Sequence, residues 1–222
     1  MKLAAKNSNR RLVQLLVAAL VLSVFLVIII TSHSDDLAVP QIANGVDPKG
    51  QPMTLGVTDA KVVIYEFSDF QCVACAKFAN RNEKYLIEDY VLKGNVRLIF
   101  VPIARLGDES QWASEAAFCA ADQHRFWQYK DILFTFQVGE NQGNFSKAKL
   151  ETYAAKVTDL NLDSFKTCLE TDQHYVDVVA GPTPASYDSS NNVLTLRLNS
   201  RILTSPYDYA ELQNLVDEVL KH

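Results

Sequence analysis

The sequence has few residues of the kinds that bind metals. It contains four cysteines and four histidines, and its only C-x-x-C pair is Cys72 with Cys75. A structural zinc site needs four ligands, usually two such pairs or one pair with an H-x₃₋₅-H segment. The sequence has neither, because its histidines are scattered along the chain. We therefore do not expect a structural zinc site, and we expect no other metal and no cofactor.

A basic stripe is also absent. Residues 1–31 hold four of the 21 basic residues and none of the 26 acidic ones, so the rest of the chain has 17 basic against 26 acidic residues, a net charge of −9. Proteins that bind nucleic acid usually present clustered positive charge. The composition therefore excludes nucleic acid as an expected partner.

Charge is missing altogether from residues 12–30 (LVQLLVAALVLSVFLVIII). As a helix, these 19 residues would span roughly 28 Å, close to the hydrocarbon thickness of a bilayer. Four basic residues precede the run, and no acidic residue occurs before Asp35. Positive charge on this flank keeps the N-terminus in the cytoplasm. The run thus predicts a membrane helix with the rest of the chain outside the cytoplasm.

A cleaved signal peptide is the alternative reading of this run. Signal peptides usually have an apolar region of about 7–15 residues and a small-x-small cleavage site. This run is longer and leaves through Thr31–Ser34 without a clean A-x-A. We therefore predict an uncleaved single-pass signal anchor in the cell membrane. The expected parts are a cytoplasmic N-terminus (1–11), the anchor (12–31), a linker (32–51) and an extracytoplasmic domain (52–222).

The order of predicted elements indicates an α/β domain with a helical insertion. Residues 61–67 and 96–101 are apolar runs of strand length, and 72–92 has helical periodicity between them, which predicts a βαβ unit. The pattern then stays helical over about 105–180. A hairpin at 193–204 and a terminal helix with apolar residues from Leu212 to Leu220 follow.

The pair Cys72 and Cys75 lies where the first strand hands over to the helix. A redox dithiol needs two sulfurs about one helical turn apart, with the first held as a thiolate. The free N–H groups and dipole of a helix N-terminus stabilise that anion. We therefore predict Cys72 as the nucleophile and Cys75 as the buried resolving thiol. Two inert core cysteines are the competing reading.

The segment Tyr65–Cys75 (YEFSDFQCVAC) resembles the active-site segment of DsbA-like thioredoxin-fold proteins, E-F-S-D-F-Q-C-x-x-C. Residues 116–127 are similar to a helix of that family's inserted domain, and 206–209 to the start of its last helix. The resemblance extends from about Pro52 to the terminal helix. It implies a thioredoxin-like fold with an inserted helical domain and thiol:disulfide oxidoreductase activity.

The resemblance also implies roles for residues around the dithiol. Glu66 stands six residues before Cys72, where such proteins carry a buried acid, and a carboxyl group in an apolar strand could relay the proton of Cys75. Its alternative is a carboxylate at a strand edge that reaches water. Some exported relatives brace the insertion with a disulfide, which implies a structural bridge between Cys119 and Cys168. Two reduced core cysteines are the alternative.

The sequence departs from the family pattern at two places. The family places a Thr-Pro with a cis peptide bond directly before the hairpin, as a substrate-binding position. Here the candidates are Thr183 and Pro184, ten residues too early, whereas counting back from the hairpin puts Leu194 there. Either the loop is rearranged or the proline is lost, and Pro184 can also be an ordinary loop proline. The dipeptide Val73–Ala74 offers no imidazole and no proline, which predicts a weaker oxidant than the most oxidising relatives.

The sequence therefore predicts a membrane-anchored oxidase that exchanges disulfides with exported, thiol-containing proteins. The family implies reoxidation by a membrane quinone-linked partner, and the anchor would raise the local concentration of the two. The same residues would serve a disulfide reductase or isomerase. A non-enzymatic Cu(I) metallochaperone is a further alternative, because thiolates bind Cu(I). The lack of a nearby histidine or methionine argues against it.

Overall fold

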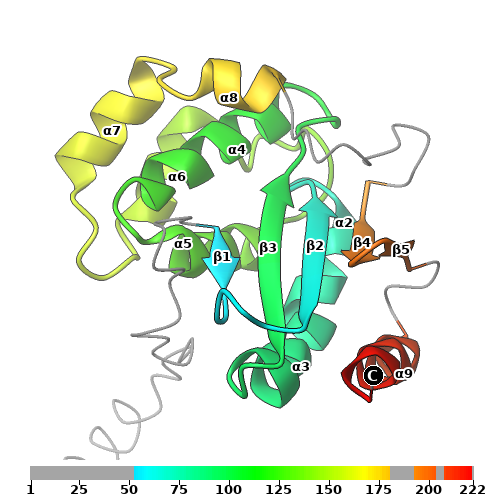
Figure 1. Cartoon of the computed structure of the whole chain (residues 1–222). Helices are drawn as coiled ribbons and strands as arrows, with labels where there is room; N and C mark the ends of the chain where they lie inside the picture. Colours follow the sequence, from blue (N-terminus) through cyan, green and yellow to red (C-terminus); the bar gives the residue numbers. More distant parts are fainter. Residues whose placement is uncertain (1–52, 181–192, 204–207, 222) are drawn as a thin grey trace, which may run out of the picture. The chain divides into compact units, whose positions relative to one another are not determined.

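The computed structural model of the chain describes residues 53–180, 193–203 and 208–221 (Figure 1). The predicted membrane anchor at 12–31 lies outside the described residues, together with the segments predicted as cytoplasmic N-terminus and linker. In the ranges that are described, no helix combines the length and the apolar character needed to cross a bilayer.

A five-stranded sheet forms the centre of the described domain (Figure 1). The strands are β1 Thr54–Leu55, β2 Val62–Ser68, β3 Val96–Pro102, β4 Thr195–Leu198 and β5 Arg201–Ile202. Their order is β1-β3-β2-β4-β5, in which β2 and β3 are parallel and every other pair is antiparallel. The predicted strands at 61–67 and 96–101 are confirmed to within a residue at each end. Because β2 has a neighbour on both sides, it is a central strand.

The two faces of β2 have different surroundings. Side chains alternate between the faces of a strand, so Ile64, Glu66 and Ser68 share one face, and all three are fully buried. This face packs into the main apolar core, which includes Phe78 and Leu86 of the following helix. Glu66, the predicted proton relay, thus lies on the face of the sheet that the following helix covers.

A long helical segment connects β2 to β3. It runs through α2 Val73–Phe78, η1 Ala79–Glu83, α3 Lys84–Leu86 and η2 Ile87–Val91. The predicted helix over 72–92 is confirmed in extent, but two of its parts, η1 and η2, are π-helical, which was not predicted. A π-helical turn contains an extra residue and changes which side chains face inward. Glu83, the last residue of η1, is buried.

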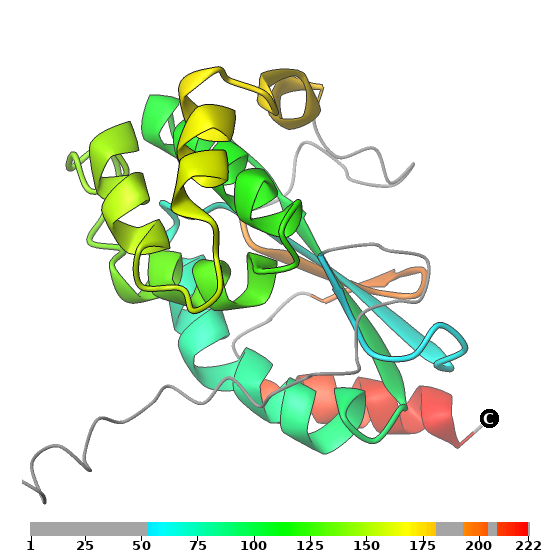
Figure 2. The same ribbon diagram turned by 90° about the vertical axis from the view of Figure 1, so that its left-hand side faces the viewer.

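The predicted helical insertion forms the helices between β3 and β4. These are α4 Asp108–Ala121, α5 Phe126–Thr135, α6 Lys147–Ala154, α7 Leu162–Glu170 and α8 Tyr175–Val179. Figures 1 and 2 show them gathered on one side of the molecule, with α4 in contact with the others. Helix α5 packs against β3, where the ring of Phe100 meets those of Phe126, Trp127 and Phe134 at centroid distances of 5.2, 6.5 and 6.2 Å.

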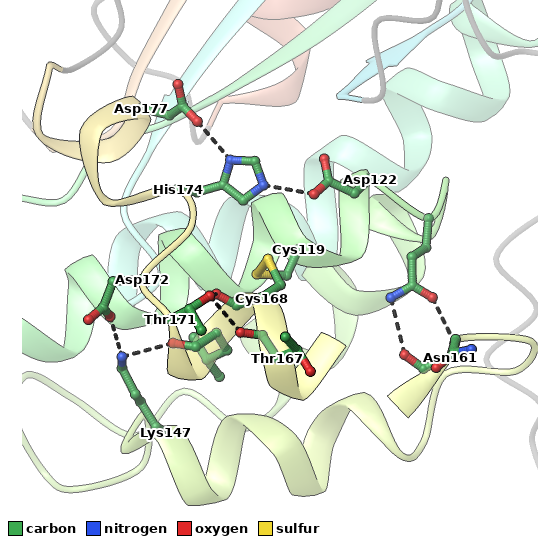
Figure 3. Close-up of a disulfide and its surroundings, with 12 residues drawn as sticks. Cys119, Asp122, Lys147, Asn161, Thr167, Cys168, Thr171, Asp172, His174 and Asp177 are labelled. Atoms are coloured by element: carbon green, nitrogen blue, oxygen red, sulfur yellow. Dashed lines mark hydrogen bonds and ion pairs between the residues drawn. A yellow bond between two sulfur atoms is a disulfide. The ribbon is translucent and has the colours of Figure 1, made fainter. Parts of the chain in front are cut away.

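A disulfide joins α4 to α7 (Figure 3). It links Cys119 and Cys168, the pair that the resemblance implies, with their Cα atoms 5.9 Å apart. Both residues are buried. The bridge closes a loop of 49 residues and so restricts the unfolded chain.

We expect the paired substitution Cys119→Ala and Cys168→Ala to lower the free energy of unfolding by about 4 kcal/mol, because the chain-entropy model assigns that value to a loop of this length. The measurement is denaturant unfolding, made in a Cys72→Ser, Cys75→Ser background so that no thiol exchange interferes. The unbridged and bridged proteins should differ in midpoint and keep the same far-ultraviolet spectrum. Equal midpoints would contradict a stabilising role for the bridge.

The chain ends in the predicted hairpin and helix. Strands β4 and β5 turn at Asn199, whose backbone φ is 51° and whose side chain accepts a hydrogen bond from the Val63 N–H at 2.9 Å. Helix α9, Tyr209–Leu220, begins after Asp208, which caps it by accepting the N–H groups of Ala210 and Glu211. Figure 2 shows α9 alongside the α3 region of the long helix. The hydroxyl of Tyr209 donates to Asp89 of η2 at 2.7 Å, in agreement with that view.

Candidate active site

Cys72 is the N-cap residue of α2. Its sulfur accepts a hydrogen bond from the backbone N–H of Cys75 at 3.1 Å, and its own N–H donates to the carbonyl of Asp69 at 3.0 Å. The side chain at this position meets free N–H groups at the positive end of the helix. The strand-to-helix turn therefore holds the sulfur where a negative charge is stabilised.

The second sulfur lies one turn further into the helix. Cys75 is 0% exposed and Cys72 is 7% exposed, so only Cys72 reaches the surface. The sulfur of Cys75 lies 3.8 Å from the backbone carbonyl oxygen of Val193. This contact brings the segment before β4 directly beside the dithiol.

The two thiols have opposite pKa shifts. The hydrogen bond from the Cys75 thiol lowers the pKa of Cys72, helped by the N–H groups of Cys75 and Ala74 and opposed by burial and by Asp69. Burial raises the pKa of Cys75 far above its usual value, and the neighbouring Cys72 adds to the shift. A lowered pKa increases the thiolate fraction of Cys72 and makes it a better leaving group. The site thus separates a nucleophile from a protonated resolving thiol.

A buried polar network holds the turn that leads to Cys72. The carboxylate of Asp69 accepts hydrogen bonds from the Gln71 N–H at 2.8 Å, the Ser110 hydroxyl at 2.6 Å and the backbone of the loop before α4. The Gln71 side-chain amide donates to the Leu106 carbonyl at 2.9 Å and to Ser110 at 3.1 Å. The insertion thereby anchors the active-site turn.

Glu66 lies on β2, opposite Phe100 of β3 and Leu196 of β4. It is 0% exposed, so it does not reach water at a strand edge. Burial raises its pKa well above the usual value, and the charge of Glu83 adds to the shift. Neither carboxylate oxygen of Glu66 has a close hydrogen-bond partner in the described part of the chain.

The candidate substrate-binding residues are only partly placed. Thr183 and Pro184 lie outside the described residues. The backbone beside Cys75 belongs to Val193, and Leu194 follows it as a buried residue just before β4. Leu194 is thus the residue directly after the carbonyl that contacts the dithiol.

One group among the described side chains brings potential metal ligands together. Asp122, Cys168 and His174 have ligand atoms within 4.8 Å of one another. The sulfur of Cys168 is bonded to Cys119, and His174 is hydrogen-bonded to Asp122 at 2.8 Å and to Asp177 at 2.7 Å (Figure 3). The disulfide therefore removes the sulfur from this ligand set.

Sequence reasoning missed two charged residues whose charges act on Glu66. Lys130 of α5 and Glu83 of η1 form a buried ion pair with a distance of 2.5 Å between Nζ and Oε2. The sequence does contain a signal for Lys130, because it shares one helical face with Phe126 and Leu133 at i, i+4 and i+7. A charged residue on an apolar helix face is a candidate for burial with a partner.

Comparison with known proteins agrees with this geometry. The family model described as "Thioredoxin" matches residues 49–218. "Disulfide bond formation protein D" of Bacillus subtilis is 26% identical over 175 residues, which cover 78% of each chain. "Probable disulfide bond formation protein D" of Bacillus anthracis is 25% identical over 97% of this chain and 99% of its own. The crystal structure of oxidised BdbD from Bacillus subtilis has a TM-score of 0.69 at 25% identity and covers 78% of this chain and 95% of its own.

The fold and the dithiol define a thioredoxin-like redox protein with a helical insertion. The chain belongs to the thioredoxin family and, within it, to the DsbA-like thiol:disulfide oxidoreductases. The predicted family, α/β fold and enzyme class are thus confirmed.

Proposed function

We propose that the chain is a membrane-anchored extracytoplasmic oxidase that introduces disulfides into exported proteins through Cys72 and Cys75. The observation that carries this proposal is the N-cap position of Cys72, whose sulfur accepts a hydrogen bond from the Cys75 N–H. Stabilising the Cys72 thiolate stabilises the reduced protein, and a stable reduced form makes the disulfide a good electron acceptor.

The reaction would proceed in two exchanges. A substrate thiolate attacks the sulfur of Cys72 in the Cys72–Cys75 disulfide, which forms a mixed disulfide and releases the sulfur of Cys75 as a thiolate. That thiolate takes a proton from Glu66. A second substrate thiolate then attacks the substrate sulfur of the mixed disulfide, and Cys72 leaves as a thiolate. The substrate loses two electrons and gains a disulfide, and the protein becomes a dithiol.

Substrate would bind along the backbone at Val193, because that segment contacts Cys75 and precedes the edge of the hairpin. Leu194 takes the place where the family carries its proline. Thr183 and Pro184 stay candidates for substrate binding. Cys119 and Cys168 take no part in the exchange, because they brace the insertion.

The anchor predicted at 12–31 would keep the domain at 52–222 on the outer surface of the cell membrane, with residues 1–11 in the cytoplasm and 32–51 as a linker. A quinone-linked membrane protein would reoxidise the dithiol. Anchoring would keep the dithiol domain and the protein that reoxidises it at the same membrane surface, which raises their effective concentration. Proteins named for disulfide bond formation in two Bacillus species support the direction of the reaction.

The equilibrium of the dithiol with glutathione tests the direction. We expect a reduction potential between about −200 and −120 mV, because Cys72 is stabilised as a thiolate while Val73–Ala74 offers no imidazole to stabilise it further. The measurement is the fraction of reduced protein, by alkylation and mass spectrometry, across a series of glutathione ratios. A reduction potential near about −270 mV, the value of thioredoxin, is typical of a reductase and would contradict an oxidase.

A further inference from the structure

A buried charged cluster lies beside Glu66 and takes no part in the steps above. The side chains of Lys130 and Glu83 form the 2.5 Å ion pair and are 1% and 2% exposed. Asp131, which is partly exposed, approaches the same ammonium group at 3.0 Å. Burying such charges costs free energy that their attraction often fails to recover, so stability alone does not explain the pair.

Phe100 of β3 connects the charged cluster with Glu66. Phe100 is the register partner of Glu66 on the neighbouring strand, and the Lys130 ammonium lies 5.9 Å from the centre of the Phe100 ring. The three charged groups therefore act on one another inside the same apolar core. Burial has the largest effect and raises the pKa of Glu66. The negative charges of Glu83 and Asp131 raise this pKa further, whereas the positive charge of Lys130 lowers it.

One ammonium group thus faces two buried carboxyl groups. Glu83 holds the ammonium directly, whereas both oxygens of Glu66 lack a close partner among the residues described. In a low-dielectric site, a charge that has a direct counter-ion stays ionised and its neighbour of the same sign keeps its proton. Burial raises the pKa of Glu83 as well, but its direct ion pair with Lys130 opposes that shift. Glu83 therefore holds the ammonium group, and Glu66 is the group that can exchange a proton.

We propose that Glu83 and Lys130 are positioning residues that set the protonation of Glu66 and thereby control proton transfer to and from Cys75, a role that rests on the proposed function of the dithiol. Lys130 comes from α5, so the helical insertion takes part in the redox chemistry and does more than cover the site. The charged side chains of Arg97 and Arg197 belong to the opposite face, where Arg197 lies 4.4 Å from the ring of Tyr65.

A two-step thiol assay separates the two sulfurs. In the reduced protein, the Cys72 thiolate attacks one sulfur of 5,5′-dithiobis(2-nitrobenzoate), and one thionitrobenzoate anion leaves. Cys75 then gives its proton to ionised Glu66 and attacks the sulfur of Cys72, which releases the second anion and forms the Cys72–Cys75 disulfide. The pH dependence of the second release reports on Glu66, and that of the first on Cys72.

We expect Glu83→Gln to move the pH midpoint of the second release downward, because Lys130 then serves Glu66 alone. A shift of one pH unit makes the second release about tenfold faster on the acidic side of the midpoint. The double variant Glu83→Gln, Lys130→Met should bring the midpoint most of the way back toward the wild-type value, because Glu83 raises the pKa of Glu66 somewhat more than Lys130 lowers it. The double variant leaves neither member of the ion pair as a buried charge without its partner, which protects its folding. The first release should keep its midpoint in all three proteins.

The return of the midpoint in the double variant is the result that a purely structural role would not produce. Damage to packing would affect both variants in the same direction, because both lack the ion pair. Coinciding midpoints for the single and the double variant would overturn the proposal. Glu115→Gln, at another buried acid of the insertion, is the matched control and should behave as wild type. A wild-type protein that releases only one anion would contradict the function of the dithiol itself.

Discussion

We expect the substitution of Cys72 by alanine to reduce oxidative refolding to the uncatalysed rate, because Cys72 is the residue of the dithiol that is in contact with solvent. Cys75 is completely buried, so it cannot replace Cys72 as the atom that a substrate attacks. The measurement is the recovery of activity by a reduced, disulfide-dependent test protein in the presence of the oxidised enzyme. Cys72→Ala should give the same curve as buffer alone.

The companion variant Cys75→Ala should behave differently. When its Cys72 is first loaded as a mixed disulfide with thionitrobenzoate, a test protein that carries a single thiol displaces the thionitrobenzoate anion and becomes linked to Cys72. Because Cys75 is absent and the test protein has no second thiol, nothing releases this complex, and it is visible on a non-reducing gel. Lys77→Ala, on the exposed side of the same helix, serves as the matched control and should retain full activity. Refolding by Cys72→Ala at the wild-type rate would disprove the role of this sulfur.

The second large effect is expected for Glu66→Gln. The glutamine has the same shape but neither donates a carboxyl proton nor accepts one, and positioned acid–base groups contribute about 100-fold or more to such steps. The release of the second thionitrobenzoate should slow by that factor near neutral pH, while the first release stays unchanged. Equal second-release rates in variant and wild type would remove Glu66 from the proton pathway.

The same substitution should stabilise the protein at higher pH. The folded-state pKa of Glu66 is raised by burial, so the folded protein binds more protons than the unfolded chain between the two pKa values. The free energy of unfolding therefore falls as the pH rises through that window, by at most about 1.4 kcal/mol per pH unit for one group. The Glu66→Gln variant does not lose free energy of unfolding in this way as the pH rises. Denaturant unfolding at several pH values should show an advantage of the variant that grows with pH, and a constant difference would contradict the shift.

Such an opposition between activity and stability is expected where a site keeps a buried acid for its chemistry. The reduced oxidoreductase keeps two such carboxyl groups, Glu66 and Glu83, with one Lys130 between them. Replacing Glu66, or both members of the Glu83–Lys130 pair together, with uncharged side chains should make the domain more stable and its proton transfer less well controlled.

Much of the active site was predictable because it is local in the sequence. Glu66, Cys72 and Cys75 belong to one strand-to-helix connection, and the periodicities of the strand and the helix largely determine which of their side chains point inward. The apolar runs also predicted the βαβ unit, the insertion, the hairpin and the terminal helix. The π-helical segments were missed, since their hydrogen-bond pattern leaves no separate mark in the apolar periodicity.

The environment of the dithiol was decided by the tertiary structure alone. The carbonyl of Val193 meets Cys75 from 118 residues away, and Lys130 meets Glu83 from 47 residues away. Such contacts arise only when the insertion packs onto the sheet and the hairpin closes beside β2. The sequence by itself determined which groups can exchange electrons and where these groups lie along the chain. The packed core decided how strongly each of them holds its proton, because a pKa depends on burial and on charges brought together in space.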